Sequence, residues 1–181
     1  MNEIAVTLLV YALAGLTLKV GDDLLDEMSR PGPSWFPLAL SGVLFGFLMS
    51  RSEWDLALLV SILLGVLASG KVNHPQFGIG FIMIACVLLL RGVPNITDIY
   101  LWIALLLVLF LASALDEKGN DWADTYGTAR ASWFFRYRLT LKVVGLLVSL
   151  LWSGFLIAAI GIWVFDLGYE IAGRLTRKYY V

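Results

Sequence analysis

The sequence predicts an all-α fold: a polytopic integral membrane helical bundle of about six transmembrane helices, built as a single domain over residues 1–181. Apolar residues make up 60% of the chain, charged residues make up 15%, and the mean hydropathy is +0.84. Such a composition is typical of a chain that is solvated mostly by lipid. The net charge of −1 gives no broad positive field, which argues against a nucleic-acid partner.

Six apolar runs account for most of the chain. They cover residues 4–21, 35–50, 54–70, 77–93, 99–115 and 139–165, and an interfacial tail is expected at 166–181. Most runs are at the short end of the roughly 17–25 residues that cross a bilayer as a helix. Proline, glycine or charged residues separate them, and these residues end helices for steric and hydrogen-bonding reasons. Five spans, with the second run re-entrant, is the alternative.

Small residues recur at the spacing of helix contacts. Gly42 and Gly46 form a GxxxG pair in the second run, and Gly145 and Ser149 repeat this spacing in the last. Such ridges let helix backbones approach closely inside a bundle. A homo-oligomer is compatible with this pattern. No period longer than a helical turn stands out, so no internal repeat is expected.

The distribution of basic residues predicts an orientation. Six spans place the first, third and fifth loops on one side, with eight of the thirteen lysines and arginines. That side is expected to be cytoplasmic, since short cytoplasmic loops are enriched in these residues. The carboxyl tail, with Arg174, Arg177 and Lys178, is expected on the opposite side.

Two acidic motifs lie on the predicted cytoplasmic side. Asp22, Asp23 and Asp26 follow the first run, and Asn120, Asp121 and Asp124 follow the fifth. The last residue of each motif is three and four positions from the other two, so a helix would gather them into one patch. Like charges at this spacing repel unless a cation lies among them. Carboxylate oxygens suit Mg²⁺, so these six residues are predicted metal ligands; charged anchors that fix the helix ends are the alternative reading.

Basic and polar side chains accompany the acids. Lys71, Asn73 and His74 form the third loop, and Arg130 and Arg136 follow the second acidic motif. Lys71 and His74 are candidate catalytic residues that could grip a phosphate or transfer a proton. Arg130, Arg136 and Asn73 are candidate substrate ligands. His74 is the only histidine, so multi-histidine zinc or haem ligation within one subunit is excluded.

The acidic motifs carry a family resemblance. Asn120-Asp121-Trp122-Ala123-Asp124 resembles the start of the NDxxDxxxD signature of UbiA-type intramembrane prenyltransferases. Asp22-Asp23-Leu24-Leu25-Asp26 resembles the DDxxD pattern of prenyl diphosphate enzymes. In those families the carboxylates hold magnesium ions that activate a diphosphate, and the resemblance implies this role here. It departs at Thr128, which stands where the last UbiA aspartate would be, and the family has about nine spans.

Three functions remain open from the sequence. The first is a magnesium-dependent enzyme that acts on a lipid phosphate or prenyl diphosphate at the cytoplasmic membrane interface, with membrane lipids as partners. The second is a cation-binding transporter or channel whose acidic vestibule gathers ions. The third is a non-catalytic membrane scaffold in which the acids fix helix ends.

Overall fold

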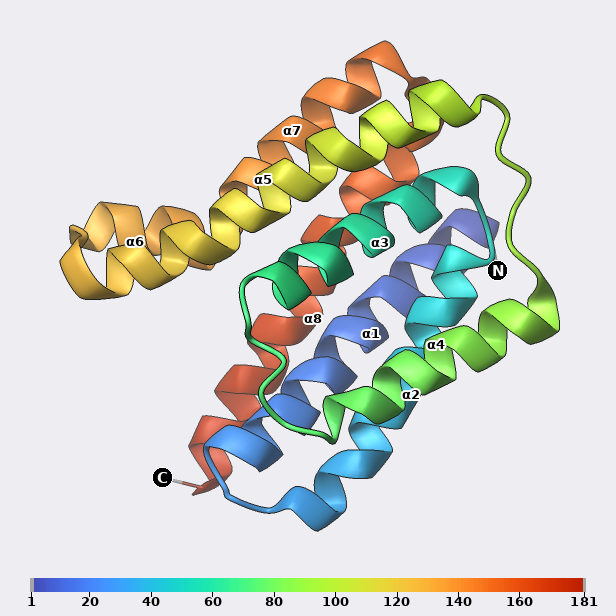
Figure 1. Cartoon of the computed structure of the whole chain (residues 1–181). Helices are drawn as coiled ribbons and strands as arrows, with labels where there is room; N and C mark the ends of the chain where they lie inside the picture. The colour runs from blue at the N-terminus through green and yellow to red at the C-terminus, as the bar shows by residue number, and fades with distance from the viewer. Residues whose placement is uncertain (1, 181) are drawn as a thin grey trace. The chain divides into compact units, whose positions relative to one another are not determined.

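The computed structural model describes residues 2–180, apart from the side chains at positions 136 and 178–180 (Figure 1). These residues form helices and turns without a β-strand, which confirms the all-α prediction. The helices are α1 (Glu3–Asp26), α2 (Pro31–Met49), α3 (Glu53–Ala68), α4 (Phe77–Arg91), α5 (Ile99–Tyr126), α6 (Ala129–Arg136), α7 (Leu139–Leu151), the 3₁₀ turn η1 (Ser153–Phe155) and α8 (Leu156–Tyr180).

Four helical segments are long and apolar enough to cross a membrane, which is compatible with an integral membrane protein. They are Glu3–Asp26, Pro31–Met49, Ile99–Tyr126 and Ser153–Arg177. Phe77–Arg91 and Leu139–Leu151 are apolar but shorter.

Local sequence explains where several helices begin and end. Pro31 opens α2, where its missing N–H would have no helical partner. The Asp98 carboxylate caps α5 by accepting the backbone N–H groups of Tyr100 and Leu101 at 2.9 and 3.1 Å. Gly92 ends α4 with φ of +86°, a conformation that favours glycine.

The chain divides into two compact units. The first contains Met1–Ser52, His74–Pro94 and Ile160–Val181, and therefore α1, α2, α4 and most of α8. The second contains Glu53–Asn73 and Asn95–Ala159, and therefore α3, α5, α6 and α7.

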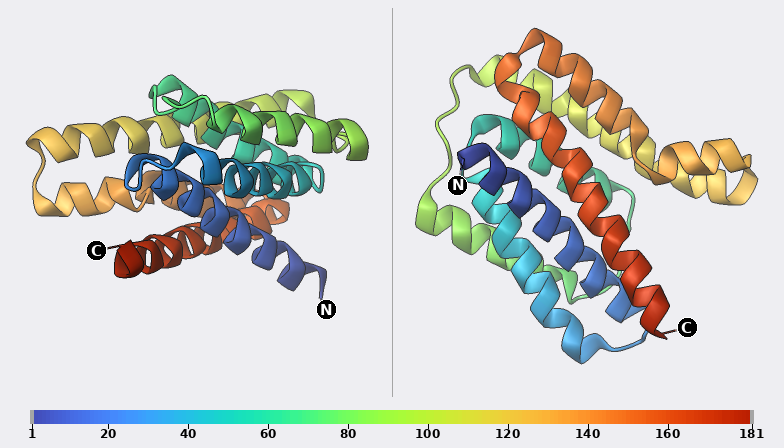
Figure 2. Two further views of the ribbon diagram at one scale, coloured as in Figure 1. Left: turned by 90° about the horizontal axis from the view of Figure 1, so that it is seen from below. Right: turned by 180° about the vertical axis from the view of Figure 1, so that it is seen from behind.

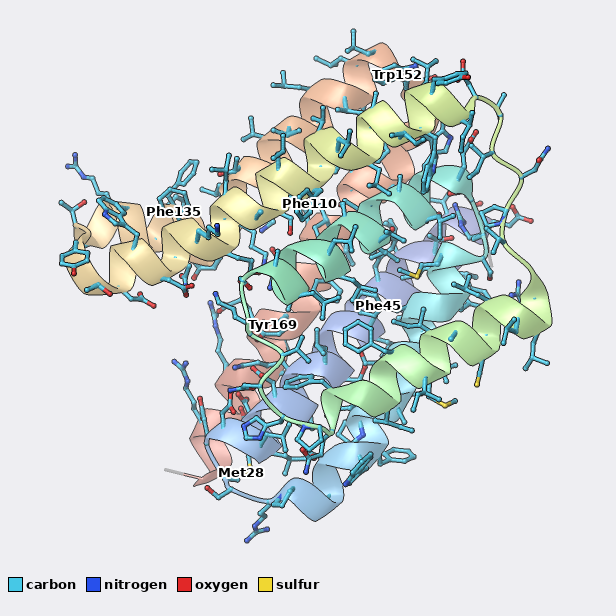
Figure 3. The ribbon with its side chains drawn as sticks, in the orientation of Figure 1. Met28, Phe45, Phe110, Phe135, Trp152 and Tyr169 are labelled. Atoms are coloured by element: carbon cyan, nitrogen blue, oxygen red, sulfur yellow. The ribbon has the colours of Figure 1, made fainter. Side chains whose placement is uncertain are left out.

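In the first unit, α1 lies between α2 and α8, and α4 packs on α2 (Figure 2). A Cβ at Gly15 would lie 2.0 Å from the Phe165 carbonyl oxygen, so the backbones of α1 and α8 touch. The predicted GxxxG ridge is used as well, because a Cβ at Gly42 would lie 2.4 Å from the carbonyl oxygen of Gly80 in α4. Phe45, labelled in Figure 3, meets Phe165 edge to face with ring centroids 5.6 Å apart.

The helices α1 and α8 run parallel. Along them Tyr11 meets Gly161, Gly15 meets Phe165 and Asp22 meets Tyr169, so residue numbers rise together. The carboxyl end of α8 therefore lies beside the carboxyl end of α1. Alternation over six spans predicts the opposite, with the tail across the membrane from the first loop. That expectation is not met within this unit.

In the second unit, α5 packs against α3, α6 and α7. The helices α3 and α5 are parallel too. The backbone carbonyl of Glu53 accepts the indole N–H of Trp102 at 2.9 Å, and further along both helices Gly65 meets Ser113. The helix α6 folds back on the end of α5, where the ring of Phe135 covers Gly119 (Figure 3).

The expected single span at 139–165 is divided in the structure. The helix α7 ends at Leu151, Trp152 is extended (φ −128°, ψ 95°), and α8 continues from Leu156 after η1. Ser153 and Gly154 lie at the break, where low helix propensity favours interruption. A Cβ at Gly154 would lie 2.8 Å from Nε1 of Trp54, so this position leaves no room for a larger residue. The expected tail at 166–181 is part of α8 over its described residues.

The polar stretch after the fifth run is also helical. The helix α5 extends from the apolar run through the acidic motif to Tyr126, and Gly127 ends it. Likewise α1 continues past Gly21 to Asp26, as the patch prediction requires. Both acidic motifs therefore occupy the last turns of long helices.

Candidate functional site

The first acidic motif lies at the end of α1 and is bound by residues of its own unit. The Lys19 Nζ lies 2.6 Å from Asp23 Oδ1 and 3.3 Å from Asp22 Oδ2. From α8, the Tyr169 hydroxyl donates to Asp22 Oδ2 at 3.0 Å, and the Thr176 hydroxyl donates to Asp23. These five residues form what we call the first cluster. Two carboxylates thus share one ammonium and two hydroxyl donors.

Burial separates the members of this motif. The Asp23 side chain is 1% exposed, whereas Asp26 is about half exposed at 52%. A buried carboxylate needs partners within the protein, and Lys19 and Thr176 provide them. The carboxylate of Asp26 lies 3.2 Å from His74 Nε2, which brings one predicted catalytic residue to one predicted metal ligand.

The second cluster lies at the end of α5 and comprises Lys71, Glu117, Asp121 and Arg138. The Lys71 Nζ is 2.7 Å from Glu117 Oε2 and 3.2 Å from Asp121 Oδ1. Arg138, which precedes α7, contacts Glu117 Oε1 at 2.9 Å. Glu117 is 6% exposed and lies between these two cations. It therefore links α5 to the segment that follows α3 and to the segment that precedes α7.

Asp116 lies outside both clusters, and its carboxylate contacts the first turn of α7. Its two carboxylate oxygens accept the backbone N–H groups of Thr140 and Leu141 at 3.1 and 2.7 Å. Those amides belong to the first turn of α7, whose preceding residue, Arg138, has a left-handed backbone and makes no side-chain cap. A carboxylate at a helix amino terminus satisfies free amides and complements the helix dipole. Asp116 therefore caps α7 from another helix.

The remaining predicted site residues lie on the surface of α5, α6 and the third loop. Asn120 donates weakly to Asp124 at 3.4 Å, and Asp124 is exposed. Arg130, in the first turn of α6, and Asn73 are exposed as well. The side chain of Arg136 lies outside the described residues. Lys71 and Asn73 belong to the second unit, whereas His74 belongs to the first.

Within the described part of the chain, no group of three or more histidine, cysteine, aspartate or glutamate side chains is arranged to hold a metal ion. The carboxylates of Asp22, Asp23 and Asp121 instead contact lysines of their own unit, and the first two also accept hydrogen bonds from hydroxyl groups. Such partners serve the same electrostatic purpose as a bound cation.

A pocket of about 250 Å³ lies at the other end of α3, lined by Trp54, Trp102 and Trp152 among other residues. Two acidic side chains border it, but both already accept hydrogen bonds from other residues of the chain. Glu53 accepts the N–H and hydroxyl of Thr97, each at 2.8 Å, and Asp98 caps α5.

Sequence reasoning missed Tyr169 and Thr176. The available signal was the α8 face formed by Phe165, Tyr169, Ala172 and Thr176, at steps of three and four residues. The apolar stripe of Leu167, Ile171 and Leu175 lies instead on the exposed face of α8.

Comparison with known protein families, curated proteins and solved structures finds no match to this chain. The resemblance to UbiA-type prenyltransferases therefore depends on the motif residues alone.

Proposed function

We propose that this chain is an integral membrane scaffold whose acidic motifs are structural joints between helix ends. One observation carries the proposal: in each unit, two carboxylates near the end of a long helix converge on a single lysine ammonium. The partners that complete each cluster come from other segments of the same unit, α8 in the first and the residue before α7 in the second. Acids that are neutralised in this way need no metal ion.

A double-mutant cycle on Lys19 and Asp23 tests this role. Lys19→Met and Asp23→Asn should each lower the melting temperature in detergent, because each leaves a buried polar partner unmatched. The double variant should lose clearly less than the sum of the two losses, since the pair acts as a unit. Additive losses would show that the pair does not hold the helix ends.

We further propose that the carboxyl ends of α1, α3, α5 and α8 lie on the cytoplasmic side. The parallel course of α8 and α1 supports moving Arg174, Arg177 and Lys178 to the side of the first, third and fifth loops. Eleven of the thirteen basic residues then share that side, which leaves Arg51 and Arg91 on the other. This asymmetry is much stronger than the eight-to-five division obtained for six spans, and it favours a cytoplasmic placement.

Labelling of single cysteines can decide the orientation. With Cys86 replaced by alanine, cysteines at Lys118 and Arg174 should react with a membrane-impermeant maleimide only after permeabilisation. A cysteine at Val93, between α4 and α5, should react in intact cells. Opposite behaviour of positions 118 and 174 would support the six-span alternation instead.

A second candidate is the magnesium-dependent enzyme that acts on a lipid phosphate or prenyl diphosphate. The observation that favours it is the exposure of Asp121 and Asp124 in the second unit, where Asp121 lies beside Lys71. In this reading Asn120, Asp121 and Asp124 bind Mg²⁺, while Lys71 and Arg130 of the same unit meet the phosphate. Asp23 is too buried to take part.

Turnover of a prenyl diphosphate in proteoliposomes tests the second candidate. Asp121→Asn and Asp124→Asn should abolish magnesium-dependent turnover while the protein remains folded. Absence of turnover in the unmodified protein, or full activity in both variants, would reject the enzyme.

A further inference from the structure

We propose that residues 8–70 and 106–168 are two copies of one three-helix segment, and that each copy contributes its third helix to the unit built on the other copy. The copies are related by a constant shift of 98 positions without a gap. The proposal departs from the expectation that the chain has no internal repeat.

The sequence correspondence is specific around the acidic motifs. Gly21, Asp23, Asp26, Ser34, Trp35 and Phe36 recur as Gly119, Asp121, Asp124, Ser132, Trp133 and Phe134. Trp54 likewise recurs as Trp152, so four of the seven tryptophans form two matched pairs. About a quarter of positions 8 to 70 carry the same residue 98 positions later. A rare residue that recurs at a fixed shift is a stronger sign of duplication than a recurring leucine.

The helices follow the same shift. The helix α2 begins at Pro31 and α6 begins at Ala129, 98 positions later, and each follows a helix that ends in an acidic motif. The matched residues of α1 and α5 also face inward together: Tyr11 and Leu109 are fully buried, Ala14 is fully buried, and Ala112 is 3% exposed. The pair α6 and α7 thus corresponds to α2, with one interruption before Leu139.

The third helices are exchanged between the units. The helix α3 belongs to the first copy, yet it packs on α5 of the second copy, where Gly65 meets Ser113. The matching helix α8 belongs to the second copy, and it packs on α1 of the first, where Phe165 meets Gly15. Gly15 and Ser113 are themselves matched positions. The contact is parallel in both units, and equivalent copies would have the same direction in both.

The two clusters contain one contact at related positions, but different residue types make it in the two units. Lys71 meets Glu117 in the second unit, and the same shift of 98, continued one residue past the copies, relates them to Tyr169 and Lys19. These also meet, with the Lys19 ammonium 5.1 Å from the centre of the Tyr169 ring. The next turn agrees: Lys71 binds Asp121 in one unit, and Lys19 binds Asp23 in the other. Asp23 and Asp121 are therefore equivalent positions, and a lysine pairs with each of them. Lys19 lies on the same helix as Asp23, whereas Lys71 follows α3 and reaches Asp121 on α5.

Transplanting one contact into the other unit tests the equivalence in the full chain without a ligand. Glu117→Lys alone places a lysine beside Lys71 and Arg138 and should lower the melting temperature in detergent. Adding Lys71→Tyr recreates the contact of the first unit, with a lysine near a tyrosine ring and one turn from Asp121. The double variant should recover at least half of the loss. The matched control, Glu117→Lys with Val72→Tyr, should recover none.

The reciprocal transplant gives an independent result. Lys19→Glu should destabilise the first unit, and Tyr169→Lys should restore it, whereas Leu167→Lys on the exposed face of α8 should not. If the Glu117→Lys variant is too unstable to purify, the yield of purified protein replaces the melting temperature as the measurement. The double variant with Lys71→Tyr should then be purified in measurable yield. Failure of both matched pairs to exceed their controls would overturn the duplication, whatever the protein's function.

Discussion

Glu117 gives the sharpest prediction because its carboxylate is buried between Lys71 and Arg138. Glu117→Gln keeps the shape of the side chain and removes its charge. Removing one partner of a fully buried pair costs about 3–5 kcal/mol. Lys71 and Arg138 are 33% and 25% exposed, so water takes up part of their charge, and Lys71 retains Asp121. The loss should therefore be about 2 kcal/mol.

The assay is thermal unfolding of the purified protein in detergent. For a chain of this size, 1 kcal/mol corresponds to roughly 2–4 °C, so Glu117→Gln should lower the melting temperature by roughly 4–8 °C. Asp124→Asn is the matched control: it removes a charge from the same helix at an exposed position and should change the free energy of unfolding by less than about 0.5 kcal/mol. Equal melting temperatures for the two variants would refute the reasoning.

Two further substitutions test the packing and capping described above. Asp116→Ala removes the acceptor of two backbone amides at the start of α7 and should lower the free energy of unfolding by about 2 kcal/mol. Amide hydrogen exchange at Thr140 and Leu141 should become faster. Unchanged exchange there would contradict the capping role. Gly15→Ala places a methyl group against the Phe165 carbonyl and should cost about 3 kcal/mol. Gly78→Ala, with open space around it, should cost nothing measurable; equal effects of the two alanines would show that α1 and α8 do not touch.

The sequence is informative about helices because apolar runs and proline breaks report local preferences directly. It predicts that a helix continues past Gly21 through the first acidic motif, and α1, which ends at Asp26, confirms this. It does not predict the break at Trp152, because an apolar run continues through it and the interruption depends on the approach of Trp54 to Gly154. Hydropathy is insensitive to such a tertiary contact.

The partners of the acids were harder to foresee for the same reason. Carboxylates at helical spacing indicate that a cation is needed, but spacing alone does not say whether the cation is magnesium or a lysine. Tyr169 is 147 residues from Asp22 along the chain, and their contact follows from the parallel packing of α8 on α1. The choice between a metal site and a structural joint therefore depends on tertiary structure.

The most direct measurement of the central claim is the melting temperature of the detergent-solubilised protein during a titration with MgCl₂ at constant ionic strength. If the chain's own lysines neutralise both acidic motifs, magnesium should produce no saturable shift, and Lys71→Met should create one by freeing Glu117 and Asp121. A saturable rise in the unmodified protein that disappears in Asp121→Asn would contradict this account.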